Sequence, residues 1–187
     1  MTLFYVEIEA KRLEFLRELV PNAEVIALLV NPKNKEAENQ IKEARVAADA
    51  IGRSLVVLEA GTESEVETAF ASGVRKRAGA LMVANDFFLT TRRNQLVGLA
   101  DQHALPTIYP WREATLAGGL MSYGAVIADS YRQAGAYIGR ILKGAKPAEL
   151  PVLQPTKFQL LLNLKTARKL GIDVPTSLLL RADEIIE

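Results

Sequence analysis

The sequence predicts an α/β protein in which a parallel sheet carries helices on its faces. Short apolar runs of strand length alternate with amphipathic stretches of roughly ten to twenty residues, which suit helices. The first of these runs, residues 24–30, is dense in β-branched and aliphatic residues, as expected for a strand that is buried on both faces. Such strands are joined by right-handed βαβ connections, so their carboxyl ends should meet at one edge of the sheet.

Composition narrows the classes of function. The chain has 187 residues, 49% of them hydrophobic and 24% charged, which is typical of a soluble globular protein with one core. Its net charge is only +1, so we expect no basic surface for binding nucleic acid. It has no cysteine and a single histidine, His103, which excludes disulfides, thiolate catalysis and multi-histidine metal sites. No apolar run is long enough to cross a membrane, and the amino terminus lacks the pattern of a signal peptide. We expect no metal and no cofactor.

Local signals place the elements in order. Pro21 ends the first helix, Asn34 offers an N-cap for the second, and Thr62 with Glu65 forms a capping box for the third, whose buried side should carry Val66, Phe70 and Val74. The predicted strands are 24–30, 54–58, 79–84, 106–109, 120–122 and 156–163. The predicted helices are 8–20, 34–52, one beginning at 62, 91–103 and 127–143, with helical turns at 164–170 and 178–186.

Residues suited to recognition follow the predicted strands. Aromatic faces can stack on a solute, a guanidinium can grip a carboxylate, and carboxylate or amide groups can pair with ammonium or hydroxyl groups. Because ligands bind outside the carboxyl ends of parallel strands, we expect these side chains to line a crevice. For any single aromatic residue, packing in the core is an equally good interpretation. The candidate ligand-binding residues are Asn31, Asp86, Phe87, Tyr109, Trp111, Arg112, Ser122 and Tyr123.

Motifs for catalysis are weak. Neither a phosphate-binding loop nor a dinucleotide fingerprint occurs, and Ser122 lacks the leading glycine of a nucleophile elbow. His103 comes at a helix end, where capping carbonyls is the simpler role. A divalent-cation site at Asp86 would need further carboxylates at the end of the first strand, and none occurs there. Glu113 is the only other candidate acid at a strand end, and it suits the start of a helix. A small enzyme that uses Asp86, Ser122 or His103 is therefore the weaker alternative to a non-catalytic binding protein.

Four segments, taken in this order, resemble the substrate-binding proteins of ABC transporters, in the branch that includes aromatic-amino-acid binders. They are residues 9–32, 100–124, 128–171 and 174–187. The resemblance implies the type I periplasmic-binding fold, in which two Rossmann-like lobes close on a solute. Residues 8–123 would form the second ligand-binding lobe, and 124–155 a crossover whose helix packs on the first lobe. Residues 156–187 would form a returning strand and a helical tail.

The resemblance also implies what the chain lacks and what it binds. Most of the first lobe has no counterpart here, so the chain reads as a truncated solute-binding component of an importer. The expected ligand is a small polar organic solute such as an amino acid or a related carboxylate, with a sugar as a further choice. The expected partner is an ABC permease when the protein is whole. The family is periplasmic, but a chain without a signal peptide would stay in the cytoplasm.

The helix predicted at 127–143 carries an apolar stripe that the first lobe would cover in a full-length relative. Without that lobe the stripe needs another cover, because a monomer rarely exposes a large apolar patch. We therefore expect a homodimer. A dimeric remnant that binds no solute is the second alternative to a binding protein. The stripe consists of Ile127, Tyr131, Ala134, Ile138 and Ile141.

Overall fold

The computed structural model describes residues 3–151 and 155–187, with side chains from residue 8 onward. Parts of the predicted amino terminus and of the crossover segment 124–155 therefore lie outside the described residues. The helices are α1 (Leu3–Leu19), α2 (Ala37–Ala50), α3 (Glu63–Arg75), α4 (Phe87–Thr91), α5 (Arg93–Gln102), α6 (Arg112–Leu116), α7 (Ile127–Leu142), the 3₁₀ turn η1 (Pro147–Glu149), α8 (Leu164–Lys169) and α9 (Thr176–Arg181). The strands are β1 (Val25–Val30), β2 (Ser54–Glu59), β3 (Ala80–Val83), β4 (Thr107–Tyr109), β5 (Met121–Ala125), β6 (Phe158–Asn163) and β7 (Glu184–Ile186).

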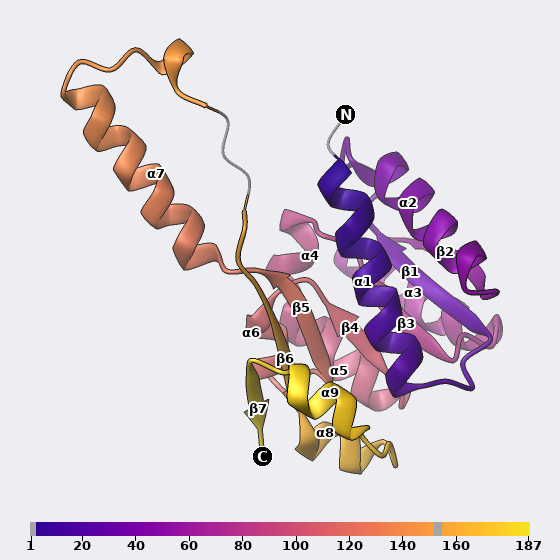
Figure 1. Ribbon diagram of the computed structural model, residues 1–187. Coiled ribbons are helices and arrows are strands. Elements are labelled where there is room, and N and C mark those ends of the chain that lie inside the picture. Colours follow the sequence, from indigo (N-terminus) through magenta and orange to yellow (C-terminus); the bar gives the residue numbers. More distant parts are fainter. Residues whose placement is uncertain (1–2, 152–154) are drawn as a thin grey trace.

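All these strands form one sheet, in the order β2-β1-β3-β4-β5-β6-β7. The pairs from β2 to β5 are parallel, β5 and β6 are antiparallel, and β6 and β7 are parallel again. The predicted fold class is thus confirmed, and the carboxyl-terminal tail extends the main sheet instead of standing apart from it. The reversal at β6 follows from the excursion through α7, after which the chain returns from the opposite direction (Figure 1).

Helices cover both faces of the sheet, and alternate strand residues point to opposite faces. In β1, Ile26 and Leu28 face α1 and α2, whereas Ala27 and Leu29 face the side of α3 and α5. All four are fully buried. The first core also takes in α8 and α9 through Ala167 and Leu178, and the second takes in α4 and α6.

Several predicted boundaries need correction. Asn34 does not cap α2: its Oδ1 accepts a hydrogen bond from the Glu36 amide in the preceding turn, and the helix begins at Ala37. The helix predicted at 91–103 is α5, which begins at Arg93. A short helix that was not predicted, α4, precedes it, because Asp86 caps its first turn through the Leu89 amide. The predicted helical turn at 178–186 ends at Arg181 and gives way to β7.

The third helix confirms its predicted cap but only part of its predicted face. Thr62 accepts from the Glu65 amide, and the Glu65 carboxylate accepts from the Gly61 amide at 2.7 Å. Val66 and Phe70 are buried as expected. Val74 is 46% exposed, because Gly73 lies against Leu58 in its place and Val74 has rotated off the buried face.

Helix α7 stands away from the body of the molecule, and the chain leaves and returns along two adjacent segments (Figure 1). These segments are joined at their base by the Val126 amide, which donates to Lys157 O at 2.9 Å. Most apolar residues of α7 are exposed, including Tyr131 at 75% and Ile138 at 58%.

Within the described residues, no helix combines the length and the apolarity that a membrane crossing requires.

Candidate functional site: the carboxyl edge of the sheet

The ends of β1 and β3 are joined by a side-chain hydrogen bond. Asn31 Nδ2 donates to Asp86 Oδ1 at 3.2 Å, and Asn31 Oδ1 accepts from the Lys33 amide. The same Asp86 oxygen accepts the Leu89 amide at 3.0 Å and so caps α4. Asn31 and Asp86 therefore lie together at the edge, as the strand pattern predicts, and both already make hydrogen bonds within the protein.

A second side-chain hydrogen bond joins the end of β3 to the turn that follows β4. Trp111 Nε1 donates to Asn85 Oδ1 at 3.1 Å, and the indole is 9% exposed. The Asn85 carbonyl accepts from Gln40 Nε2 of α2 at 2.9 Å. The ends of β1, β3 and β4 thus form one polar row, in which Trp111 has a fixed orientation.

Beyond Trp111 lies a cleft of about 320 Å³ between α6, the end of β5 and the first turns of α7. This volume is at the lower end of the range for small-molecule sites. Its lining is Pro110, Trp111, Arg112, Glu113, Ala125, Val126, Ile127, Ala128, Tyr131 and Gln159. It combines two aromatic rings, one guanidinium, one carboxylate and one amide, which is a set suited to binding a polar organic molecule.

Arg112 is the cation of this cleft. Its Nη2 bonds Glu184 Oε2 of β7 at 2.8 Å, and its Nη1 lies 3.5 Å from Gln159 Oε1. Both side chains of the ion pair are partly exposed, at 38% for Arg112 and 42% for Glu184. An exposed pair of this kind is held weakly. A carboxylate arriving in the cleft could therefore compete with Glu184 for the guanidinium.

The wall of the cleft depends on a close approach of two backbone segments. A Cβ at Gly124 of β5 would lie 1.9 Å from Pro110 O, which is far inside van der Waals contact. Only glycine therefore lets β5 pass beneath the turn that carries Trp111 and Arg112. This residue was not singled out from the sequence, and nothing in a single sequence distinguishes it from an ordinary turn glycine.

Two of the predicted aromatic residues, Phe87 and Tyr123, lie in different environments. Phe87 is 84% exposed on α4, so it neither plugs the edge nor packs in the core. Tyr123 is half-buried: its ring meets Phe15 edge-on at 5.0 Å between centroids and stacks on Phe158 at 5.9 Å. Burial raises the pKa of the Tyr123 phenol.

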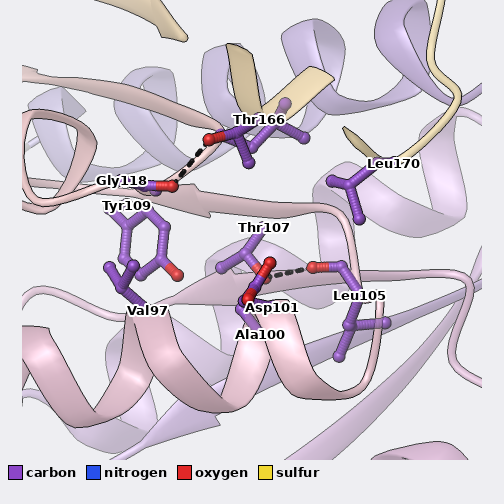
Figure 2. A pocket seen from close by; sticks show the side chains of 11 residues that line it. Val97, Ala100, Asp101, Leu105, Thr107, Tyr109, Gly118, Thr166 and Leu170 are labelled. Atoms are coloured by element: carbon purple, nitrogen blue, oxygen red, sulfur yellow. Dashed lines mark hydrogen bonds between the residues drawn. The ribbon is translucent and has the colours of Figure 1, made fainter. Parts of the chain in front are cut away.

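Tyr109 does not reach the edge at all. Its ring is completely buried on the α5 side, and burial raises the pKa of its phenol. Figure 2 shows the ring beside Val97, with the hydroxyl turned into a pocket of about 10 Å³, which is room for roughly one water molecule. Tyr109 is a core residue because the strand alternation turns its side chain toward α5 and α6.

The residues of the enzyme alternative are dispersed. The Ser122 side chain is buried and its hydroxyl has no hydrogen-bond partner within the described residues. His103 is the C-cap residue of α5, and its ring stacks on Phe70 at 6.2 Å. Asp86 is occupied by Asn31 and Leu89. Among the residues that the structure describes, no cluster of three or more histidine, cysteine, aspartate or glutamate side chains could hold a metal ion.

The structure adds residues that the sequence did not select, chiefly Asn85, Tyr131 and Gln159. Asn85 had a signal, since it directly precedes Asp86 at the end of a strand. Gln159 enters from β6, opposite Gly124 in the antiparallel register. Its strand lies more than thirty residues further along the chain, and only the sheet order brings it to the cleft.

The sheet and its polar edge define one lobe of a periplasmic-binding-protein fold. The chain belongs to the family described as ABC transporter substrate binding protein, whose model matches residues 6–186. A comparison with curated protein sequences finds no match.

Solved structures show the same fold at low sequence identity. The ABC domain in complex with L-Trp from Streptococcus pneumonia is 24% identical with a TM-score of 0.87, and the match covers 96% of this chain and 62% of that one. A conserved domain protein from Vibrio cholerae is 23% identical with a TM-score of 0.88, covering 95% and 60%. The open, ligand-free substrate binding protein CD0873 from Clostridium difficile is 21% identical with a TM-score of 0.69, covering 94% and 59%. This chain thus spans about three fifths of the length of these structures.

Proposed function

We propose that this chain supplies one lobe of a solute-binding protein of an ABC importer and binds a small polar organic solute without catalysis. The observation that carries the proposal is the 320 Å³ cleft, in which Trp111 and Arg112 lie side by side on the lining. A flat aromatic face beside a guanidinium suits a solute with a carboxylate. An amino acid is therefore the first choice, and the bound L-Trp of the Streptococcus structure supports that class.

We assign the parts of the chain accordingly. Residues 8–123 form the second lobe with the returning strand in 156–187, and 124–155 cross toward the position of the first lobe. A single lobe encloses a solute on one side only, and small-molecule sites bury most of their ligand. High affinity and transport therefore depend on the other lobe and on a membrane permease. The binding protein itself would operate in the periplasm.

The experiment follows the emission of Trp111, the only tryptophan in the chain. Non-fluorescent solutes are titrated in three classes: amino acids such as phenylalanine and leucine, simple carboxylates, and sugars. L-Trp is tested by calorimetry. A saturable response to amino acids or carboxylates supports the proposal, a response to sugars alone redirects it to another solute class, and silence in every class contradicts it.

Two variants test the role of Arg112. Arg112→Gln should weaken binding of a carboxylate on the order of tenfold or more, as expected for losing a charge-assisted hydrogen bond. Glu184→Gln should strengthen it, because the guanidinium loses its internal competitor. Arg45→Gln, at an exposed position of α2, is the matched control and should change nothing. Equal affinity in Arg112→Gln and Arg45→Gln would remove Arg112 from the site.

We further propose that the apolar face of α7 pairs with the same face of a second copy. Its five stripe residues are spaced four, three, four and three apart, which is the spacing of a two-helix seam. The positions that flank the seam are uncharged: Ala128, Ser130, Gly135, Tyr137 and Leu142. A self-pairing face of this kind creates no like-charge contact.

Sedimentation velocity over a range of concentrations tests the pairing. The parent chain should form a dimer that Ile138→Glu abolishes, whereas Arg140→Glu, on the same helix but off the seam, should leave it intact. A parent chain that stays monomeric at high micromolar concentration overturns the pairing. Solute binding by such a monomer would still stand.

A further inference from the structure

Strand β5 runs past the end of its neighbour β4. The two strands pair only at Ile108 with Met121 and Tyr109 with Ser122. Beyond that point β5 continues through Tyr123, Gly124 and Ala125, paired with β6 on its other side. One edge of this outgoing segment therefore has no strand beside it.

The carbonyl of Tyr123 points to that unpaired edge. In the antiparallel ladder the Asn163 amide bonds Leu120 O, and the Val126 amide bonds Lys157 O, each at 2.9 Å. Backbone groups along a strand alternate in direction, so the even-numbered residues of β5 face β6 and Tyr123 faces the side of β4. A part-buried carbonyl in this position needs a donor from elsewhere.

Arg12 of α1 provides the donor. Its Nε bonds Tyr123 O at 2.8 Å, and its Nη1 bonds Glu9 Oε1, one helical turn earlier, at 2.7 Å. The planar guanidinium can serve both acceptors at once, which a lysine ammonium cannot do with the same geometry. The side chains of this pair are only 4% and 2% exposed, so the ion pair lies inside the protein.

Packing alone does not account for such a pair. A buried ion pair contributes little net stability compared with apolar residues of the same size. Leu13 and Leu16 already fix α1 to the sheet through apolar contacts. What an apolar residue could not supply at this position is a hydrogen bond to the outgoing strand.

We propose that Glu9 and Arg12 are positioning residues that fix the outgoing end of β5 and thereby the direction in which the chain leaves for α7. The ring of Tyr123 packs between Phe15 and Phe158, and these contacts also hold the outgoing end of β5 in place. The inference rests on the proposed function in one respect: the cleft that it positions, between Arg112 and the start of α7, is the proposed solute site.

The test compares a buried ion pair with an exposed one. The double variant Glu9→Gln/Arg12→Met removes both buried charges together, so that neither is left unpaired. The control, Asp101→Asn/Lys169→Met, removes an exposed pair between α5 and α8. Arg12→Lys is the milder variant should the double variant fail to fold, since it keeps the charge but not the fork.

Two measurements need no solute. Amide hydrogen exchange at residues 123–126 should accelerate on the order of tenfold relative to β1, as for loss of one charge-assisted hydrogen bond. Because the chain has no cysteine, spin labels at Ala136→Cys on α7 and Glu67→Cys on α3 report the direction of α7. Their distance distribution should broaden in the double variant and in Arg12→Lys, and stay unchanged in the control.

Acceleration that is equal across the whole sheet, or an unchanged distance distribution in both variants, overturns the positioning role. In the first case the pair would affect global stability only. Either result leaves the solute titrations untouched, so the failure of this inference is distinguishable from the failure of the proposed function.

Discussion

The central strands and helix α7 both carry clear apolar patterns, but these patterns end in opposite environments. Leu28 of β1 and Leu81 of β3 have no exposed surface, whereas Ile138 and Tyr131 of α7 are mostly exposed. The same kind of signal therefore reports a core in one region and an unpartnered face in the other. The difference teaches that periodicity identifies a face that should be covered, but not what covers it.

The largest expected difference comes from truncating matched aliphatic side chains in the two regions. Leu28→Ala should lower the free energy of unfolding by about 2–5 kcal/mol, because it opens a cavity in a filled core. Ile138→Ala should stay within about 0.5 kcal/mol under dilute conditions. Chemical denaturation of both variants checks this, and a large loss in Ile138→Ala would show that α7 is covered within a single chain.

A second pair of variants compares glycines. Gly124→Ala places a methyl group against Pro110 O and should cost about 3 kcal/mol through displacement of the Trp111 turn. Gly135→Ala on α7 meets nothing within 4 Å and should raise stability by about 0.5–1 kcal/mol, since alanine is the better helix former. Thermal unfolding measures both, and a neutral Gly124→Ala would refute the close approach.

The cap at the sheet edge should have a smaller effect. Asp86→Ala removes the acceptor of the Leu89 amide and should cost about 1 kcal/mol. Asp86→Asn keeps an oxygen at the cap and should cost much less. If both variants lose the same amount in urea unfolding, the contribution of Asp86 comes from its charge and not from the cap.

The smallest effect concerns the base of α7 and depends on pH. Hydrogen bonds from Gln133 and Lys157 hold the pKa of Asp129 below its ordinary value. A depressed carboxyl pKa contributes stability above the unfolded value, near 3.9, and that contribution is lost as the pH falls through the folded pKa. The protection factors of the amides in the first turn of α7, which are corrected for the intrinsic exchange rate at each pH, should therefore fall as the pH drops through the folded pKa. Asp129→Asn should abolish this dependence, and a dependence that persists in it would have another source.

The elements of the sheet were predictable because each carries its own local signal. The aliphatic run of β1 and the capping box at Thr62 both act within a few residues of themselves. The gathering of Asn31, Asp86 and Trp111 at one edge also followed, since parallel strands end on the same side. Their role in binding a solute stays a prediction.

What failed were the details that depend on which of two good signals prevails. Asn34 and Asp86 are both strong capping residues, yet only Asp86 caps a helix. Asn34 instead accepts the Glu36 amide in the preceding turn, and its own side-chain amide donates to Asn85 O at 3.4 Å. Tyr109 and Trp111 are both aromatic residues at a strand end. One turns into the core and the other to the edge, as the pleat of β4 and the start of α6 require.

The sequence by itself determined the alternation of strands and helices, the two-sided burial of the central strands and the apolar face of α7, because these depend on periods of two and of three to four residues. Only the tertiary structure decided that β6 and β7 complete the sheet, that Arg112 meets Glu184, and that Arg12 reaches Tyr123 across 111 positions of chain. These contacts depend on which distant segments the sheet order brings side by side, and a single sequence carries no local mark of that.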